Sequence, residues 1–222
     1  MQLPAHNDLF PVSAQQGAVL ARQDRQGQSL AAFVQVSFTT AFDENRLRAV
    51  LDELLARHEI LQTRYQRLDG MRRPVQCVAP QAAMLLRVER GTETLASVRE
   101  ALREALLEAP CAAVAKVEGD TAFSVMLAAP LASLDAGALA QLAHELQQGY
   151  ASQLPAADAD ALQYIDYASW QGELAAEDIG VRGAAWWRGV RAGVGVRPRL
   201  PFERDGQVCT QLSHLSTAAD AQ

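Results

Sequence analysis

The order of predicted strands and helices indicates an α+β fold, with helices packed on a largely antiparallel, mixed sheet. Strand-forming and helix-forming segments alternate along the chain. Tight turn signals join two pairs of predicted strands, which favours antiparallel pairing. With 222 residues, 49% of them hydrophobic and 21% charged, the chain also has enough apolar side chains to build a core.

The first predicted elements are a helix, a strand and a second helix. Ser13 precedes good helix formers at positions 14–24 and predicts an N-cap. The partly alternating run at 30–38 predicts a strand. Asp43 then precedes an amphipathic helix that ends near residues 57–58. Its apolar side chains recur at helical spacing: Leu47, Val50, Leu51, Leu54 and Leu55.

Three strands and another helix follow. Residues 61–68 and 73–78 predict strands on either side of the turn Asp69-Gly70, and residues 83–88 predict a further strand. The helix spans residues 94–107. Its apolar face consists of Leu95, Val98, Leu102, Ala105 and Leu106.

The second half begins with two apolar runs, 111–117 and 122–128, around the hairpin signal Gly119-Asp120. Ser133 or Asp135 is expected to cap a third helix that continues to residue 146. A linker at 154–160 leads to helical segments at 161–174 and 183–190. These carry the aromatic side chains Tyr164, Tyr167, Trp170, Trp186 and Trp187. Residues 193–206 predict irregular structure, and residues 207–215 predict a last strand.

Charge and cysteine content argue against several classes of function. A net charge of −6 without a Lys/Arg-rich run lacks the basic surface of a nucleic-acid-binding protein. The widely spaced Cys77, Cys111 and Cys209 predict small core residues, and no metal site is expected. We find neither a signal peptide nor an apolar run long enough to span a membrane. These features predict a cytoplasmic protein.

Three segments resemble motifs of condensation domains, the peptide-bond-forming units of nonribosomal peptide synthetases. Residues 12–20 are similar to the family's L-S-x-A-Q pattern at Ser13 and Gln16. Residues 56–65 resemble R-H-E-x-L-R-T-x-F most specifically, and they keep Arg57, His58, Glu59, Leu61 and Thr63, with Tyr65 as a close replacement. Residues 163–171 resemble Y-x-D-F/Y-A-x-W at Tyr164, Asp166 and Trp170.

The likeness continues through Trp187-Arg188 and residues 200–204, so that it covers residues 11–205. It implies a lobe of the chloramphenicol-acetyltransferase-like fold.

A fourth segment, third in chain order, departs from the family at the residues that carry the chemistry. The family motif is H-H-x-x-x-D-G. Aligning Asp135 on its aspartate places Pro130 and Leu131 on the histidines and Ala136 on the glycine. In the family the second histidine positions or deprotonates the acceptor amine as it attacks a thioester. That needs a lone pair and a pKa near neutrality. Leu131 has neither, and general acid–base catalysis is worth about 10²- to 10⁴-fold.

The remaining motif residues are interpreted as structural. The resemblance places Asp135 opposite an arginine, but N-capping of the following helix is favoured. His58 is expected to be a structural residue near the sheet edge, and Arg57 with Glu59 a structural ion pair. Ser133 is expected to cap a helix rather than act as a nucleophile. The five aromatic side chains of the C-terminal helices are expected to pack in the core rather than to form a ligand platform.

The resemblance also implies a division of the chain. A complete condensation domain has two similar lobes with the active-site tunnel between them. Residues 1–206 are expected to form the N-terminal lobe, and residues 207–222 a crossing strand and the start of a missing C-terminal lobe. Whether the chain is an excised fragment or a natural half-domain stays open.

We therefore expect a non-catalytic condensation-like module of a nonribosomal peptide synthetase or hybrid assembly line. It would serve as a platform for peptidyl carrier and adenylation domains, or for a tailoring enzyme. The alternative is an acyltransferase that works by substrate positioning once a second lobe completes it, and a weaker one is an unrelated acyl-CoA binder. No cofactor is expected, but the phosphopantetheine arm of a carrier protein is a candidate ligand.

Overall fold

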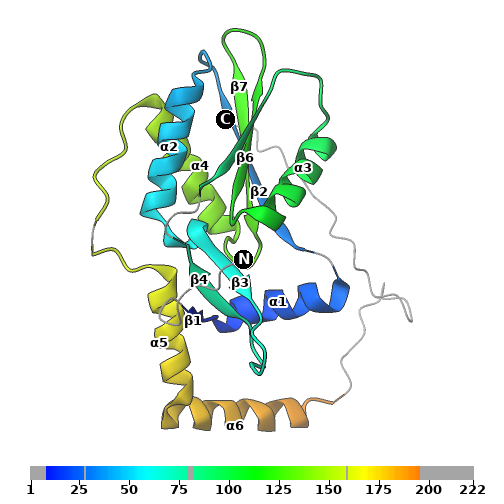
Figure 1. The fold of residues 1–222 in the computed structure, drawn as a ribbon. Helices are drawn as coiled ribbons and strands as arrows, with labels where there is room; N and C mark the ends of the chain where they lie inside the picture. Colours follow the sequence, from blue (N-terminus) through cyan, green and yellow to red (C-terminus); the bar gives the residue numbers. More distant parts are fainter. Residues whose placement is uncertain (1–8, 28, 80–82, 159, 196–222) are drawn as a thin grey trace, which may run out of the picture. The chain divides into compact units, whose positions relative to one another are not determined.

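The computed structural model describes residues 9–27, 29–79, 83–158 and 160–195, and the chain divides into two units. The first ends at Glu177 and holds every strand of the described residues (Figure 1). The second begins at Asp178 and contains helix α6 (Asp178–Gly193), none of whose residues is buried. The predicted boundary at 206/207 and the predicted last strand lie outside the described residues.

A four-stranded sheet with the order β2-β7-β6-β5 forms the centre of the first unit. Strands β2 (Ala31–Phe38) and β6 (Ala112–Val117) both pair antiparallel with β7 (Phe123–Pro130). Strand β5 (Leu85–Glu89) runs parallel to β6. The sheet is therefore mixed and largely antiparallel, as the sequence predicted.

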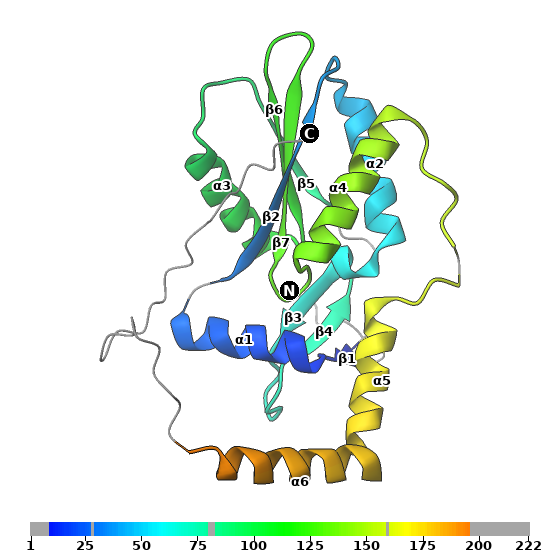
Figure 2. The ribbon, with the colours of Figure 1, turned by 180° about the vertical axis from the view of Figure 1, so that it is seen from behind.

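Helices cover both faces of this sheet, as Figures 1 and 2 show. On one face lie α2 (Glu44–Arg57) and α4 (Ala136–Ala151), whose apolar side chains form the larger core with one side of β7. On the other face lies α3 (Leu95–Glu108). Side chains of a strand alternate between faces, and β7 shows this: Phe123, Val125 and Leu127 enter the larger core, whereas Met126 and Ala128 meet α3.

The apolar faces of the two predicted amphipathic helices are buried to different extents. All five apolar positions of the α2 face are buried. On α3 only Val98 and Leu102 are buried, and Leu95 is 49% exposed. Leu95 nevertheless lies on the predicted side of the helix, since it lines one cavity together with Val98. Leu95 is the first residue of α3 and lines an open cavity.

A second sheet with the order β1-β4-β3 lies under helix α1 (Ala14–Gln26), which crosses it in both views. Its strands β1 (Leu9–Pro11), β4 (Val75–Val78) and β3 (Thr63–Gln66) pair antiparallel. The 3₁₀ turn η2 (Glu59–Gln62) leads from α2 into β3, and helix α5 (Tyr164–Ala176) contacts β1 and η2. The sequence did not predict β1 or the separation into two sheets.

Cys77 and Cys111 are buried, as predicted, whereas Cys209 lies outside the described residues. Burial raises the pKa of the Cys111 thiol to about 12. Within the described ranges, no helix is long and apolar enough to cross a membrane.

Candidate functional site

The loop between β7 and α4 contains Leu131 and follows Pro130, the two residues that the sequence alignment placed on the histidines of the family motif. Pro130 ends β7 opposite Ala31, and the backbone N–H of Leu131 donates to the carbonyl of Leu30 at 2.8 Å. The carbonyl of Pro130 accepts the Ser133 N–H at 2.8 Å and closes a turn. The side chain of Leu131 packs against the larger core. The predicted strand before this loop and the helix after it are therefore both present.

Asp135 is the N-cap of α4, as favoured from the sequence. Its Oδ1 accepts the Ala138 N–H at 2.8 Å, and Ala136 is the first residue of the helix. Among the described residues no arginine pairs with this carboxylate.

A buried chain of side-chain hydrogen bonds leads to this loop from the other motif segments. Gln16 Nε2 donates to Gln76 Oε1 and to the Tyr65 hydroxyl, each at 3.1 Å. The Tyr65 hydroxyl shares a hydrogen bond of 3.0 Å with the Ser133 hydroxyl. Gln76 Nε2 in turn donates to the carbonyl of Pro11 at 2.8 Å. Gln16 and Gln76 are both almost fully buried, so these bonds replace water as their partner.

Ser13 extends this polar chain to a further motif segment. Ser13 and Gln16 form a capping box at the start of α1, with Ser13 N–H donating to Gln16 Oε1 at 2.8 Å. The Ser13 hydroxyl shares a hydrogen bond of 2.9 Å with the hydroxyl of Tyr164 on α5. Residues from all four family-like segments thus belong to one connected set of hydrogen bonds. We call Ser13, Gln16, Tyr65, Gln76, Ser133 and Tyr164 the polar chain.

The electrostatics of the polar chain do not favour nucleophilic chemistry at Ser133. Burial raises the pKa of Tyr65 to about 12, although hydrogen bonds with Ser133 and Gln16 act in the opposite direction. A phenol with such a pKa stays protonated near neutrality and cannot take a proton from Ser133. The capping prediction for Ser133 was wrong, since Asp135 caps the helix and Ser133 bonds to Tyr65 instead.

The segment that begins with Arg57 connects three helices and the turn η2. His58 Nε2 lies 2.6 Å from Glu145 Oε2 on α4. Gln163, the N-cap residue of α5, accepts the Glu59 N–H at 3.2 Å through Oε1 and donates to the Arg57 carbonyl at 3.3 Å through Nε2. The Thr63 hydroxyl donates to the Glu59 carbonyl at 2.9 Å. These contacts connect the segment to α4 and to the start of α5.

The predicted ion pair between Arg57 and Glu59 was wrong. The Arg57 guanidinium instead pairs with Glu53 at 3.2 Å, one helical turn earlier on α2, and also donates to the Pro155 carbonyl. Arg57 is the last residue of α2 and Glu59 the first of η2. The guanidinium reaches Glu53 because residues four apart share one face of a helix.

Glu145 is the partner of His58 that the sequence did not reveal, because 87 positions separate them. Burial alone would raise the pKa of Glu145, but hydrogen bonds from His58 and Gln141, together with the charges of His58 and Arg57, hold it below the usual carboxyl value. The result is a charged, hydrogen-bonded carboxylate between two helices. No group of three metal-binding side chains gathers anywhere in the described part of the chain.

Helix α5 begins at Tyr164, three residues after the predicted start at 161, and Asp166 Oδ2 accepts the N–H of its N-cap residue Gln163 at 2.9 Å. The prediction that the aromatic side chains pack in the core was wrong for most of them. Trp170, Trp186 and Trp187 are each more than half exposed, and Tyr167 is also exposed. Aromatic residues at helical spacing predict a face that can be covered, but the pattern cannot tell whether the described chain covers it.

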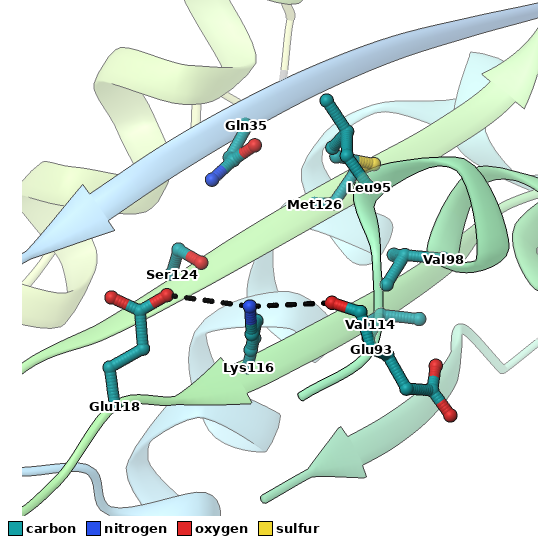
Figure 3. A pocket seen from close by; sticks show the side chains of 9 residues that line it. All are labelled: Gln35, Glu93, Leu95, Val98, Val114, Lys116, Glu118, Ser124 and Met126. Carbon is teal, nitrogen blue, oxygen red and sulfur yellow. Dashed lines mark hydrogen bonds and ion pairs between the residues drawn. The ribbon is translucent and has the colours of Figure 1, made fainter. Parts of the chain in front are cut away.

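A cavity of about 250 Å³ lies elsewhere, between α3 and the sheet (Figure 3). Apolar and polar side chains both line it, and the Lys116 ammonium there donates to the Glu93 carbonyl at 3.4 Å and lies 3.9 Å from Glu118. It opens beside Ser124, six residues before Pro130 on β7, about 20 Å along a strand. It is therefore separate from the motif loop.

Comparison with known proteins decides the family. The sequence model of the condensation-domain family matches residues 6–214 of this chain. The chain belongs to the condensation-domain family. A curated relative of this condensation domain, a probable nonribosomal peptide synthetase named CymA from Salinispora arenicola, is 31% identical over 172 residues. That match covers 71% of the chain and 2% of the relative.

Two solved structures, a cyclization-docking bidomain and a condensation domain, show a similar fold. The cyclization-docking bidomain of EpoB from Sorangium cellulosum matches with a TM-score of 0.65 at 22% identity, covering 89% of this chain and 41% of that one. The condensation domain of the monacolin K polyketide synthase MokA matches with a TM-score of 0.65 at 20% identity, covering 91% and 48%. The chain thus spans less than half the length of these solved chains.

Proposed function

We propose that this condensation domain is catalytically inactive and serves as a structural and docking platform in a nonribosomal peptide synthetase or hybrid assembly line. The observation that carries the proposal is the chemistry of residues 130–136. Asp135 is the one side chain there that carries a charge, and its Oδ1 caps α4. The Ser133 hydroxyl is bonded to Tyr65. No group in this loop is placed to take a proton from an attacking amine.

The preserved scaffold supports the docking half of the proposal. A buried polar network rigidifies a fold when its members are all satisfied, and the polar chain joins all four family-like segments in this way. Under this proposal the partners are peptidyl carrier and adenylation domains of the same assembly line, or a tailoring enzyme. The phosphopantetheine arm of a carrier is the candidate ligand, no metal takes part, and the cytoplasm is the expected location.

The lengths of the solved relatives fit a further part of the proposal. Residues 1–206 would form the N-terminal lobe, and the chain from residue 207 would begin a second one.

The second candidate function is an acyltransferase that works by positioning alone. The retained backbone of the loop favours it, with its turn at Pro130 and its cap at Asp135, because correct placement of two reactants itself lowers a barrier.

The test uses the full protein that contains this chain, with donor and acceptor aminoacyl groups loaded on purified carrier domains. Mass spectrometry measures the dipeptide, and surface plasmon resonance measures carrier binding. We expect binding, with dipeptide formation within about tenfold of the protein-free background, since the missing base is worth about 10²- to 10⁴-fold. A condensation domain with an intact histidine motif is the positive control.

Two results would contradict the proposal. Dipeptide formation about 10²-fold above background or more would favour the positioning acyltransferase. An absence of carrier binding would remove the docking platform. A Pro130→His/Leu131→His variant then tests whether the loop lacks anything besides its base. A higher rate of dipeptide formation by this variant would mean that the backbone of the loop already has a geometry suited to catalysis.

A further inference from the structure

An arginine-rich surface stands out on this acidic chain. The segments 14–27 and 63–78, which form α1 and the β3–β4 hairpin, contain six arginines and two aspartates. They therefore carry four positive charges in excess within a chain whose net charge is −6. The arginines are Arg22, Arg25, Arg64, Arg67, Arg72 and Arg73.

Contacts between α1 and the hairpin bring these arginines to one region of the first unit. The Arg67 guanidinium forms an ion pair with Asp24 near the end of α1, and its Nη1 donates to the carbonyl of Arg72 at 3.3 Å. At the other end of the same helix, Gln16 bonds to Tyr65 on β3. Both views show α1 crossing the hairpin (Figures 1 and 2).

Most of these arginines have no acidic partner among the residues that the structure describes. Arg67 is paired with a carboxylate, and Arg64 donates to the carbonyl of Glu108. The remaining four arginines form neither an ion pair nor a side-chain hydrogen bond within the described residues, and all four are exposed: Arg22, Arg25, Arg72 and Arg73. We call these four the free arginines. Their planar guanidinium groups suit carboxylates and phosphates.

We propose that the free arginines bind the acidic surface of a phosphopantetheine-bearing carrier domain. This inference rests on the proposed function, because that function makes a carrier domain the partner. The surface fits a protein better than a nucleic acid, since the rest of the chain carries ten negative charges in excess and would repel a long phosphate backbone. The phosphopantetheine arm gives a carrier domain a single phosphodiester, which suits a small group of arginines better than a long phosphate backbone does.

The free arginines lie close to the residues that lead to the motif loop. Arg67 lies two residues after Tyr65, about 7 Å along an extended chain, and its Nη1 donates to the carbonyl of Arg72, one of the free arginines. Tyr65 reaches the motif loop through Ser133. A carrier held by the free arginines would therefore bring its arm close to the loop that replaces the histidine motif.

The experiment measures binding of a purified holo-carrier domain from the same assembly line to the full protein, by isothermal titration calorimetry at low and high salt. Two charge-reversal variants, Arg22→Glu/Arg25→Glu and Arg72→Glu/Arg73→Glu, each change the charge by four units. The matched control, Arg48→Glu/Arg103→Glu, makes the same change at exposed arginines of α2 and α3 that pair with neighbours on their own helices. Circular dichroism and thermal unfolding check that all variants fold.

We expect binding that weakens with salt and falls about tenfold in each of the two variants, with a change below about twofold in the control. Equal carrier binding by all proteins would overturn this inference and leave the docking function standing. Loss of affinity in the control as large as in the variants would also overturn it, since net charge rather than this surface would then govern binding. No carrier binding by the unaltered protein would overturn both proposals. A DNA duplex serves as the competing probe, and tighter binding to it than to the carrier would reassign the surface.

Discussion

Two family-like segments of this protein have diverged in opposite ways. The segment that begins at Arg57 resembles its motif at most positions, with Gln62 in place of the motif's second arginine, and its residues connect α2, α4, α5 and η2. The loop at residues 130–136 has a turn and a helix cap, but the proposed alignment places Pro130 and Leu131 on the histidines of the family motif. Under this alignment the comparison separates residues that hold the scaffold from residues that would perform the reaction, and the fold does not depend on the histidines.

The largest expected effect is at Gln16, which bonds to Ser13, Tyr65 and Gln76 in the polar chain. Removing its side chain tests whether the polar chain stabilises the scaffold. We expect Gln16→Ala to destabilise the first unit by about 3 kcal/mol, because it leaves Gln76 Oε1 and the Ser13 N–H without a partner and opens a buried cavity. For a unit of this size that lowers Tm by about 6–12 °C. Thermal and urea unfolding measure the change.

The matched control is Gln15→Ala, the exposed neighbour on the same helix. A change within about 0.5 kcal/mol is expected there. If both variants lost the same stability, the polar chain would not be the link between the loop and the other motif segments.

The sequence predicted the secondary structure well where local physics decides it. The caps at Ser13, Asp43 and Asp135 mark helix starts, and the buried face of α2 follows directly from its spacing. Local pattern could not predict that β1 joins β3 and β4 in a separate sheet. A strand of three residues has too few side chains to show alternation, and pairing between strands is decided by tertiary contacts.

The site was predicted less completely, since its contacts join residues far apart in the chain. The motifs identified Ser13, Gln16 and Tyr164, but not that Tyr65 would meet Ser133 or that His58 would meet Glu145. One signal was available. Gln76 is a polar residue in the short apolar strand β4, and a buried amide in such a place requires partners.

A second test concerns Tyr65, which connects the polar chain to the motif loop, and it uses the pH dependence of the free energy of unfolding. The folded-state pKa of Tyr65 is raised to about 12, so its stabilisation is complete below the pKa of about 10 in the unfolded chain and is lost as pH rises toward 12. By pH 11 the wild-type protein should lose about 1.4 kcal/mol from this group.

Tyr65→Phe lacks the ionisable hydroxyl, so its urea-unfolding curve should show a shallower decline between pH 9 and 11. The difference between the two curves isolates Tyr65 from Cys111, whose pKa is also raised by burial. Parallel curves would mean that the Tyr65 hydroxyl is hydrated, and the polar chain would then not be sealed from solvent.

The smallest expected effect lies in the segment at Arg57, at the pair of His58 and Glu145. Because the folded-state pKa of Glu145 is lowered, its contribution is present above the unfolded pKa and is lost as pH falls through the folded value. Glu145→Gln should cost about 1 kcal/mol at pH 7, and this difference from wild type should shrink below about pH 4. Glu53→Gln is the control, since its carboxylate is more exposed and its loss should be smaller. If the difference in unfolding free energy between wild type and Glu145→Gln stayed constant down to pH 2.5, Glu145 would act through packing alone. The charged contact between His58 and Glu145 would then not be what connects α2 to α4.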